Sequence, residues 1–233
     1  MPRIPLIEDL TTGPIPPGSN LMVEYNPVSQ WHNASLTIAA GWLRTGGRVS
    51  YNVFTQPPDH VRTRLKQLGL DVDSLEREKE LGIQDWFSAT VGRKSEEKLA
   101  QPTLKVADLS IAWSKRFGQS QPQPELLVMD DDSSTVARFN DEKIWTEFVL
   151  TRDMFAAPLL KSTMINPYTK GVHSDWVYKR FEAAFDGVIE FELNESGMAT
   201  KDMIRIRSMR NVGFNREWHQ LKIGENLEVT LEK

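Results

Sequence analysis

The sequence contains no cysteine among its 233 residues, and this absence removes three kinds of chemistry. Without a thiol the chain can form no disulfide, no thiolate zinc site and no cysteine nucleophile. A chain built without disulfides suits a reducing compartment, and we expect a cytoplasmic protein.

Long apolar runs and an excess of positive charge are also absent. No stretch reaches the ~18 apolar residues of a membrane span, and the N-terminal segment MPRIPLIEDL has prolines and acids where a signal peptide has an apolar core. The formal net charge is −4, whereas proteins that hold nucleic-acid backbones are usually basic. We therefore expect no membrane partner and no nucleic-acid partner.

Histidine is scarce, and its positions do not indicate a metal site. The four histidines are His32, His60, His173 and His219, and no two have the spacing of zinc ligands. We interpret His32 as a ring packed against its neighbours.

Predicted strands and helices alternate along most of the chain. Residues 20–24 and 126–129 are apolar enough for buried strands, whereas apolar residues recur at helical spacing over 29–45 and 142–159. Such alternation is typical of βαβ units in a mostly parallel sheet. Further strands are predicted at 48–54, 83–87, 162–165 and 188–191, further helices at 61–68, 106–117 and 176–185, a loop at 119–124, and a strand meander at 204–210, 218–223 and 227–231.

The composition is that of one folded unit. Hydrophobic residues make up 39% and charged residues 26% of the chain, which excludes a disordered or fibrous protein. We predict a single α/β domain over residues 1–233, with a lead-in at 1–19 and a C-terminal β meander at 200–233.

The first strand-to-helix loop lies where ligands bind in open α/β sheets. The lead-in before it, Gly13 to Ser19 (GPIPPGS), resembles the GGIPKGS segment of KaiC-type ATPases of the RecA superfamily. A strand that begins near Tyr51, a Leu-Gly-Leu-Asp segment at 68–71 and an apolar strand ending in Asp130 follow in the same order. The resemblance covers nearly the whole chain in layout. It implies a three-layer P-loop NTPase fold with a mostly parallel sheet and antiparallel C-terminal strands.

The loop itself departs from the family pattern G-x-x-x-x-G-K-[ST]. In that pattern the glycines let backbone amides wrap the phosphates, the lysine reaches the terminal phosphates and the hydroxyl holds Mg²⁺. By the resemblance, Tyr25 and Gln30 stand at the two glycines. Trp31 stands at the lysine, and His32 stands at the Ser/Thr. The degenerate loop consists of Tyr25, Asn26, Pro27, Val28, Ser29, Gln30, Trp31 and His32.

Residues in three other parts of the chain bear on the same chemistry. Thr55 and Gln56 stand where the family has paired glutamates that activate water, so neither can act as a general base. Arg210 alone remains of the late K-x-R-G motif that reaches a neighbouring subunit's nucleotide. By the resemblance, Asp130 corresponds to the acid that orients Mg²⁺. Three interpretations of Asp130, Asp131 and Asp132 remain open: a retained metal site, a solvated strand end, or a turn stabilised by aspartate side chains.

Two groups of residues leave alternatives open. Trp31 either fills the former nucleotide pocket or anchors a partner, whereas most of the other six tryptophans are expected in the core. Arg205, Arg207 and Arg210 form a basic strand that either binds single-stranded nucleic acid or is a solvated face.

We expect an inactivated, archaeal-type paralogue of these ATPases, which neither hydrolyses ATP nor needs a cofactor. It would act as a regulatory or scaffold protein through contacts with another protein, with a paralogous ATPase or with itself. The alternatives are a small-ligand sensor that uses the emptied pocket beside Tyr25, Trp31 and His32, residual nucleotide binding through the helix N-terminus and Asp130, and a recombinase paralogue that binds single-stranded DNA.

Overall fold

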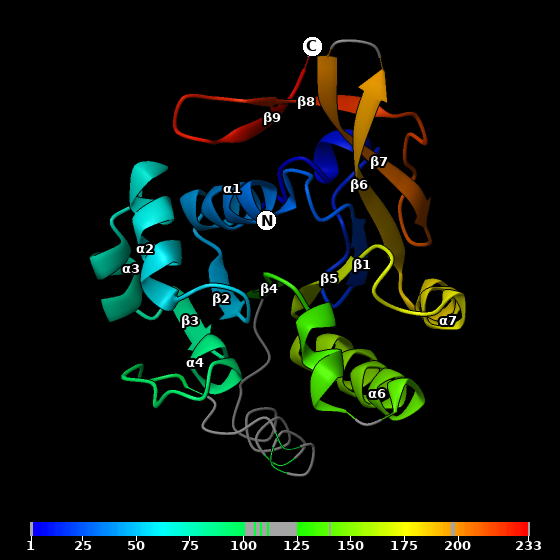
Figure 1. The fold of residues 1–233 in the computed structure, drawn as a ribbon. Coiled ribbons are helices and arrows are strands. Elements are labelled where there is room, and N and C mark those ends of the chain that lie inside the picture. Colours follow the sequence, from blue (N-terminus) through cyan, green and yellow to red (C-terminus); the bar gives the residue numbers. More distant parts are fainter. Residues whose placement is uncertain are drawn as a thin grey trace.

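The described strands form one twisted sheet through the middle of the molecule (Figure 1). The computed structural model describes residues 2–100, 105, 108, 111, 125–139, 141–196 and 199–232. Nine described strands lie in the order β3-β2-β4-β5-β1-β6-β7-β8-β9. They are β1 (Asn20–Tyr25), β2 (Arg48–Val53), β3 (Leu81–Asp85), β4 (Glu125–Met129), β5 (Thr163–Thr169), β6 (Gly187–Ser196), β7 (Ala199–Met209), β8 (His219–Ile223) and β9 (Val229–Leu231).

The strands from β3 to β6 are parallel, and those from β6 to β9 are antiparallel. β1 lies between β5 and β6, where Leu21 pairs with Ile165 on one side and with Gly187 on the other. All six residues of β1 are buried, as expected for a strand covered on both faces. The α/β class and the C-terminal meander predicted from the sequence are therefore confirmed.

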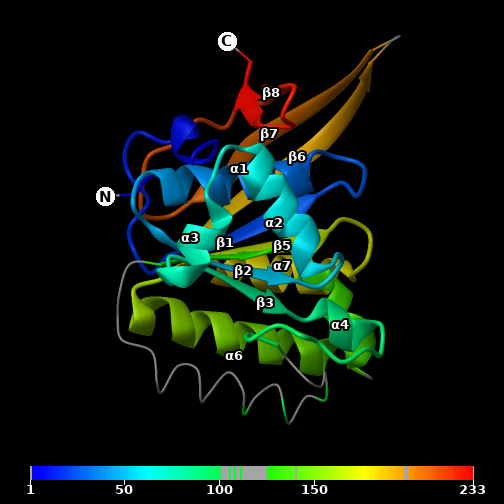
Figure 2. The same ribbon diagram turned by 90° about the vertical axis from the view of Figure 1, so that its left-hand side faces the viewer.

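Helices cover both faces of the parallel part of the sheet, which gives three layers (Figure 2). One face carries α1, α2, α3 and the N-terminal segment, and the other carries α6 and α7. Neighbouring residues of a strand point to opposite faces, so Leu21 and Val23 pack in the first core and Met22 in the second. The helices are α1 (Trp31–Arg44), α2 (Pro58–Gln67), α3 (Val72–Arg77), α4 (Phe87–Thr90), α6 (Glu142–Leu160) and α7 (Asp175–Ala184).

Local chemistry explains where several helices begin and end. α6 begins after Asp141, whose carboxylate accepts the backbone N–H groups of Lys143 and Ile144. α2 begins with Pro58, which needs no N–H donor partner in the first turn. Beyond α1 the chain turns at Gly46, whose φ of +77° favours glycine.

Most predicted elements are present, with shifted ends. The six residues expected in the central strands are buried: Leu21, Val23, Val49, Val53, Leu127 and Val128. The strand expected at 162–165 continues as β5 to Thr169 because β1 pairs with it along its whole length. The strand expected at 83–87 ends at Asp85, whose carboxylate accepts the Ser88 N–H and starts α4. The helix predicted at 106–117 and the loop at 119–124 lie outside the described residues, apart from single positions.

The N-terminal segment packs directly on α1, and one glycine permits this contact. Gly41 lies within α1, where a Cβ atom would stand 2.6 Å from Cγ of Pro5. Glycine costs a helix about 1 kcal/mol relative to alanine. We infer that the close approach of the Pro5 ring offsets this cost.

We therefore expect Gly41→Ala to lower the free energy of unfolding by about 1 kcal/mol, because overpacking costs about 1–3 kcal/mol and exceeds the gain in helix propensity. In a Pro5→Ala background the ring is gone, and the same change is expected to be neutral or stabilising. Urea unfolding of the four proteins measures both effects, and equal effects in both backgrounds would contradict the proposed contact.

Candidate functional site

The candidate site is the loop that joins β1 to α1 at the carboxyl end of the sheet. Tyr25 ends β1 as a buried residue, and Trp31 begins α1. Between them Pro27 and Val28 are exposed, whereas Ser29 is buried. The loop carries no lysine or arginine, so no side chain in it can neutralise a phosphate.

Four backbone N–H groups of this loop, between Asn26 and Gln30, already have acceptors within the chain. The Asn26 N–H donates to the Phe191 carbonyl at 3.0 Å, and the Val28 N–H donates to Oδ1 of Asn26 at 3.1 Å. The Ser29 N–H donates to the Asn26 carbonyl at 2.9 Å, and the Gln30 amide interacts with the Asp202 carboxylate. Proline has no N–H. The stretch from Asn26 to Gln30 therefore presents no row of free amides that could wrap a phosphate, whereas α1 begins at Trp31 without a side-chain cap.

Trp31 fills space below this loop. Its side chain is fully buried, and its indole Nε1–H donates to the backbone carbonyl of Asp130 at 2.9 Å. The ring packs near Tyr25 and edge-on against Phe191, with centroids 6.1 and 5.3 Å away. Of the two roles considered for Trp31, a plug agrees with these contacts, and a buried ring cannot anchor a partner.

Asp130 is held by donors from two neighbouring segments. Its Oδ1 accepts the N–H groups of Phe54 and Asp131, each at 2.8 Å. Its Oδ2 accepts the N–H of Thr55 at 3.0 Å and the Thr55 hydroxyl at 2.8 Å. Burial raises the pKa of this carboxyl to about 6 although these hydrogen bonds oppose the shift. With two donors on each oxygen, the carboxylate has little capacity left for a cation.

The next two aspartates are also buried, so the expectation of a solvated strand end is wrong. Asp131 stabilises a turn by accepting the N–H groups of Ser133 and Ser134 at 3.1 and 3.0 Å, as the second interpretation required. Burial raises the pKa of Asp131 to about 7, and the nearby Asp130 adds to the shift. Asp132 forms a buried ion pair with Arg152, with Oδ2 and Nη2 2.6 Å apart.

A buried histidine lies on the same edge of the sheet, and sequence reasoning missed it. His173 stacks on Trp145 with centroids 4.4 Å apart, and its Nε2 is 2.8 Å from the Ser133 hydroxyl. Its Nδ1 lies 3.4 Å from Oε1 of Glu142, and burial lowers the pKa of the imidazole. Glu142 also accepts the N–H of Ser174, which precedes α7. This network joins the loops after β4 and β5, and no spacing in the sequence signals it.

The basic strand predicted near the C-terminus is neutralised within the chain. Arg207 pairs with Glu24 at 2.7 Å and with Glu190 at 3.3 Å, and Arg205 also pairs with Glu190. Both glutamates are buried, and both arginines are only partly exposed. The alternation behind the solvated-face interpretation is present, since Ile204 and Ile206 are buried and the arginines between them are partly exposed. Arg205 and Arg207 are nevertheless held in ion pairs and are not free to hold a nucleic-acid backbone.

The remaining predicted residues are spread over different parts of the molecule. Thr55 binds Asp130, and the Nε2 atom of Gln56 is buried without a hydrogen-bond partner. His32 packs edge-on against Tyr25, and burial lowers its pKa. Arg210 follows β7 at the opposite end of the sheet from the loop, where its guanidinium donates to the Ala183 carbonyl at 2.6 Å.

Most tryptophans are buried, but two are partly exposed. Trp42, Trp86 and Trp145 belong to the cores, as expected, and Trp113 lies outside the described residues. Trp176 on α7 is 44% exposed and Trp218 before β8 is 37% exposed. Nothing in the spacing of the tryptophans distinguished these two.

Two shallow hollows of about 490 and 460 Å³ lie beside residues 8–14, and no residue of 25–32 lines either of them. Within the described ranges, no three histidine, aspartate or glutamate side chains form a group that could hold a metal ion. None of the helices in the described part of the chain is both long and apolar enough to span a membrane.

A parallel sheet in this order, covered on both faces and with a loop at the carboxyl end of β1, defines a P-loop NTPase fold of the RecA type. Comparison by sequence makes the assignment more specific. The family model "ATPase: KaiC" matches residues 37–232, and the chain belongs to this family. The matched range begins after the loop at 25–32. Among curated proteins, no sequence match was found.

Two archaeal structures have the same fold. The KaiC-like protein PH0186 from Pyrococcus horikoshii OT3 is 20% identical, with a TM-score of 0.73 and coverage of 100% of this chain and 97% of that chain. The flagellar accessory protein FlaH from Methanocaldococcus jannaschii is 14% identical, with a TM-score of 0.73 and coverage of 100% and 99%. The resemblance to KaiC-type ATPases and the predicted fold are confirmed.

The raised pKa values of the buried aspartates lead to a testable pH dependence. A carboxyl whose pKa is raised on folding contributes stability that is present below its unfolded value and lost as the pH rises through its folded value. For Asp131 this window runs from the ordinary value near 3.8 to about 7. We expect wild type to lose more stability than Asp131→Asn between about pH 5 and pH 8, because the amide does not titrate.

Urea midpoints at the two pH values measure this difference. His173 titrates in both proteins and cancels in the comparison. Asp175→Asn, at an exposed position, is the control and is expected to follow wild type. A destabilisation by Asp131→Asn that is equal at both pH values would contradict the prediction.

Proposed function

We propose that this member of the KaiC family is non-catalytic and acts as a regulatory or scaffold protein through contacts with other proteins. The observation that carries the proposal is the state of the loop at 25–32. Its backbone donors between Asn26 and Gln30 are engaged, Trp31 lies buried below it, and it contains no lysine or arginine. Each of these features removes a contact on which phosphate binding depends.

The residues that an ATPase uses to hold Mg²⁺ and to activate water are also unavailable or replaced in this chain. Asp130 is the acid expected to orient Mg²⁺, but both of its oxygens accept hydrogen bonds from the chain. Thr55 cannot serve as a general base, because a neutral hydroxyl does not take up a proton near neutral pH. Its hydroxyl instead donates to Asp130. These observations support a protein that does not hydrolyse ATP.

Exposed apolar side chains support a role in protein contacts. Trp176 and Val172 are 44% and 50% exposed, and Ile144 is 58% exposed. Glu142 joins their segments because it accepts both the N–H and the hydroxyl of Ser174. Large apolar residues gathered on a surface favour binding of another protein. The partner class is therefore a protein, which includes a paralogous ATPase or a second copy of this chain.

The alternatives receive less support. A small-ligand sensor requires an empty pocket beside Tyr25 and Trp31, but the Trp31 ring is buried in that region. A recombinase-like DNA binder requires free cations, but Arg205 and Arg207 are paired with glutamates. Residual nucleotide binding at the start of α1 would rest on the N–H groups of the helix end alone, because the loop before it supplies no lysine or arginine.

Titration calorimetry with ATP and Mg²⁺ tests the proposal. We expect no binding in the micromolar range and no release of phosphate, since a single lost charge-assisted contact costs about 1.5–3 kcal/mol and several are lost together. Micromolar affinity, or phosphate release that disappears in Asp130→Asn, would overturn the proposal.

A variant that restores the family pattern provides the matched comparison. It combines Tyr25→Gly, Gln30→Gly, Trp31→Lys and His32→Thr, and we expect it to recover some ATP binding. Removing the buried Trp31 ring costs about 3–5 kcal/mol of stability, so thermal melting must first show that the variant is folded. A folded variant without any binding would contradict the position-by-position match of the loop to the family pattern.

A further inference from the structure

The hollow of about 460 Å³ lies between the N-terminal segment and the loop that joins β7 to β8. Residues 9–12 line it from the first segment, and residues 214–216 and 219 line it from the second. Its volume is within the range of about 300–1,000 Å³ that is usual for ligand sites. The hollow is open to solvent and is separate from the loop at 25–32, so it presents a second surface at which the chain can bind a partner.

Backbone hydrogen bonds hold the two segments of this hollow together. The Thr12 N–H donates to the Gly213 carbonyl at 2.7 Å, and the Asn215 N–H donates to the Leu10 carbonyl at 2.9 Å. Glycine permits the close approach, since a Cβ atom on Gly213 would stand 2.6 Å from Oγ1 of Thr12. A site that is formed in advance loses less conformational entropy when it binds.

Arg216 brings a positive charge to the hollow. Its guanidinium lies over the ring of Phe214, 5.4 Å from the ring centroid, which is within the range of a cation–π contact. Arg216 is exposed and forms no ion pair with any residue that the structure describes. The guanidinium has several N–H donors and no acceptor, and it can donate to two oxygens at once. The side chain is thus positioned by a ring but has no anionic partner.

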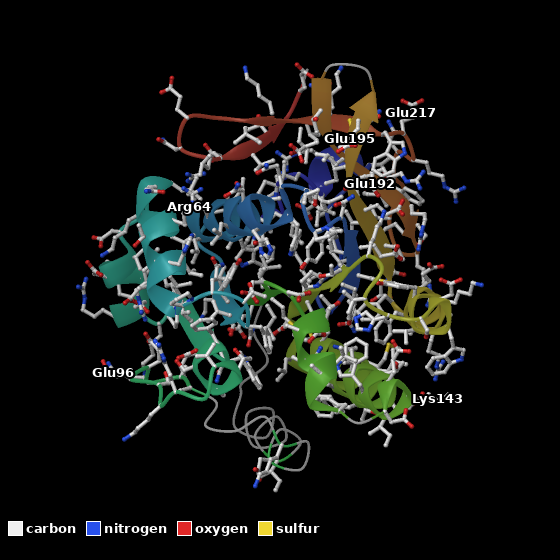
Figure 3. The ribbon with its side chains drawn as sticks, viewed as in Figure 1. Arg64, Glu96, Lys143, Glu192, Glu195 and Glu217 are labelled. Carbon is white, nitrogen blue, oxygen red and sulfur yellow. The ribbon has the colours of Figure 1, made fainter. Side chains whose placement is uncertain are left out.

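The acidic residue that lines the hollow is already neutralised. Asp9 forms an ion pair with Arg3, and its Oδ2 also accepts the Leu6 N–H at 2.9 Å. Glu217 follows Arg216 in the sequence but does not line the hollow, and Figure 3 shows it at the periphery of the molecule. Among the lining residues, Arg216 therefore carries the permanent charge that is available to a ligand.

A single carboxylate has the chemistry that this hollow can bind. A guanidinium and a carboxylate form two parallel hydrogen bonds, and the nearby Leu10 and Phe214 offer apolar contacts to the rest of the ligand. A nucleic acid carries a phosphate at every nucleotide and needs several cations, whereas here one cation lies near the acids Asp9 and Glu217. Because the hollow is open, it suits a side chain on a protein segment better than an enclosed small molecule.

We propose that this hollow binds an aspartate or glutamate side chain from an exposed segment of a partner protein. Arg216 supplies the charge, and Leu10 and Phe214 supply the apolar contacts beside it. The inference rests on the proposed function, because it names the chemistry by which the protein partner is recognised. The loop at 25–32 takes no part in this contact.

Two short peptides test the inference on the whole chain. Acetyl-Leu-Asp-Leu-amide carries the carboxylate, and acetyl-Leu-Asn-Leu-amide carries a neutral side chain of nearly the same shape. We expect the aspartate peptide to shift the NMR signals of the Asn215 amide and of the Arg216 Nε–H group in a saturable manner that weakens with added salt. The asparagine peptide and inorganic phosphate at the same concentration are expected to cause smaller shifts.

Matched variants locate the effect. Arg216→Gln removes the charge, and we expect affinity for the aspartate peptide to fall about fivefold, as for one partly exposed ion pair. Arg93→Gln makes the same change at an exposed arginine that follows α4 and lies outside the hollow, and it is expected to bind as wild type does. The Asn215 amide reports binding in all three proteins, and thermal melting establishes that both variants are folded.

Equal shifts with both peptides, equal shifts with phosphate, no saturable shift in the millimolar range, or unchanged affinity in Arg216→Gln would overturn the inference. A parallel titration of each protein with ATP and Mg²⁺ separates the two ideas. Micromolar ATP binding would overturn the proposed function, whereas loss of the peptide effect without ATP binding would overturn only the assignment of this hollow.

Discussion

The carboxyl end of the sheet depends on the hydrogen bonds of Asp130. Its carbonyl accepts the Trp31 indole from α1, and its carboxylate holds the backbone of Phe54 and Thr55 after β2. These bonds join segments that follow three different strands, and an unpaired polar group buried there would cost about 1–3 kcal/mol. The residue expected to hold a metal ion therefore has a structural role at this edge.

Several acidic side chains near this edge are neutralised by basic side chains of the same chain. Asp132 pairs with Arg152, Glu24 pairs with Arg207, and Glu192 pairs with Lys170. The pair of Asp132 and Arg152 is fully buried, and a buried charge that loses its partner is strongly destabilising, so Arg152 is held in place.

The family match and the two archaeal structures describe the fold of this chain. The residues of the loop at 25–32 differ from those of the family pattern G-x-x-x-x-G-K-[ST]. An open α/β sheet places the loops of several strands side by side at one edge, whatever residues they contain. In this chain Trp176, near the start of α7, is 44% exposed.

The sequence by itself determined the α/β class, the buried central strands and the family, because apolar periodicity and turn residues act over short stretches of chain. It also predicted that the candidate functional site contains the loop at 25–32 and Asp130. Only the tertiary structure decided that Trp31 is buried and that Arg207 is neutralised by Glu24. Each of these facts depends on residues about 100 or more positions apart meeting in space, and the patterns of local sequence carry no information about such pairings.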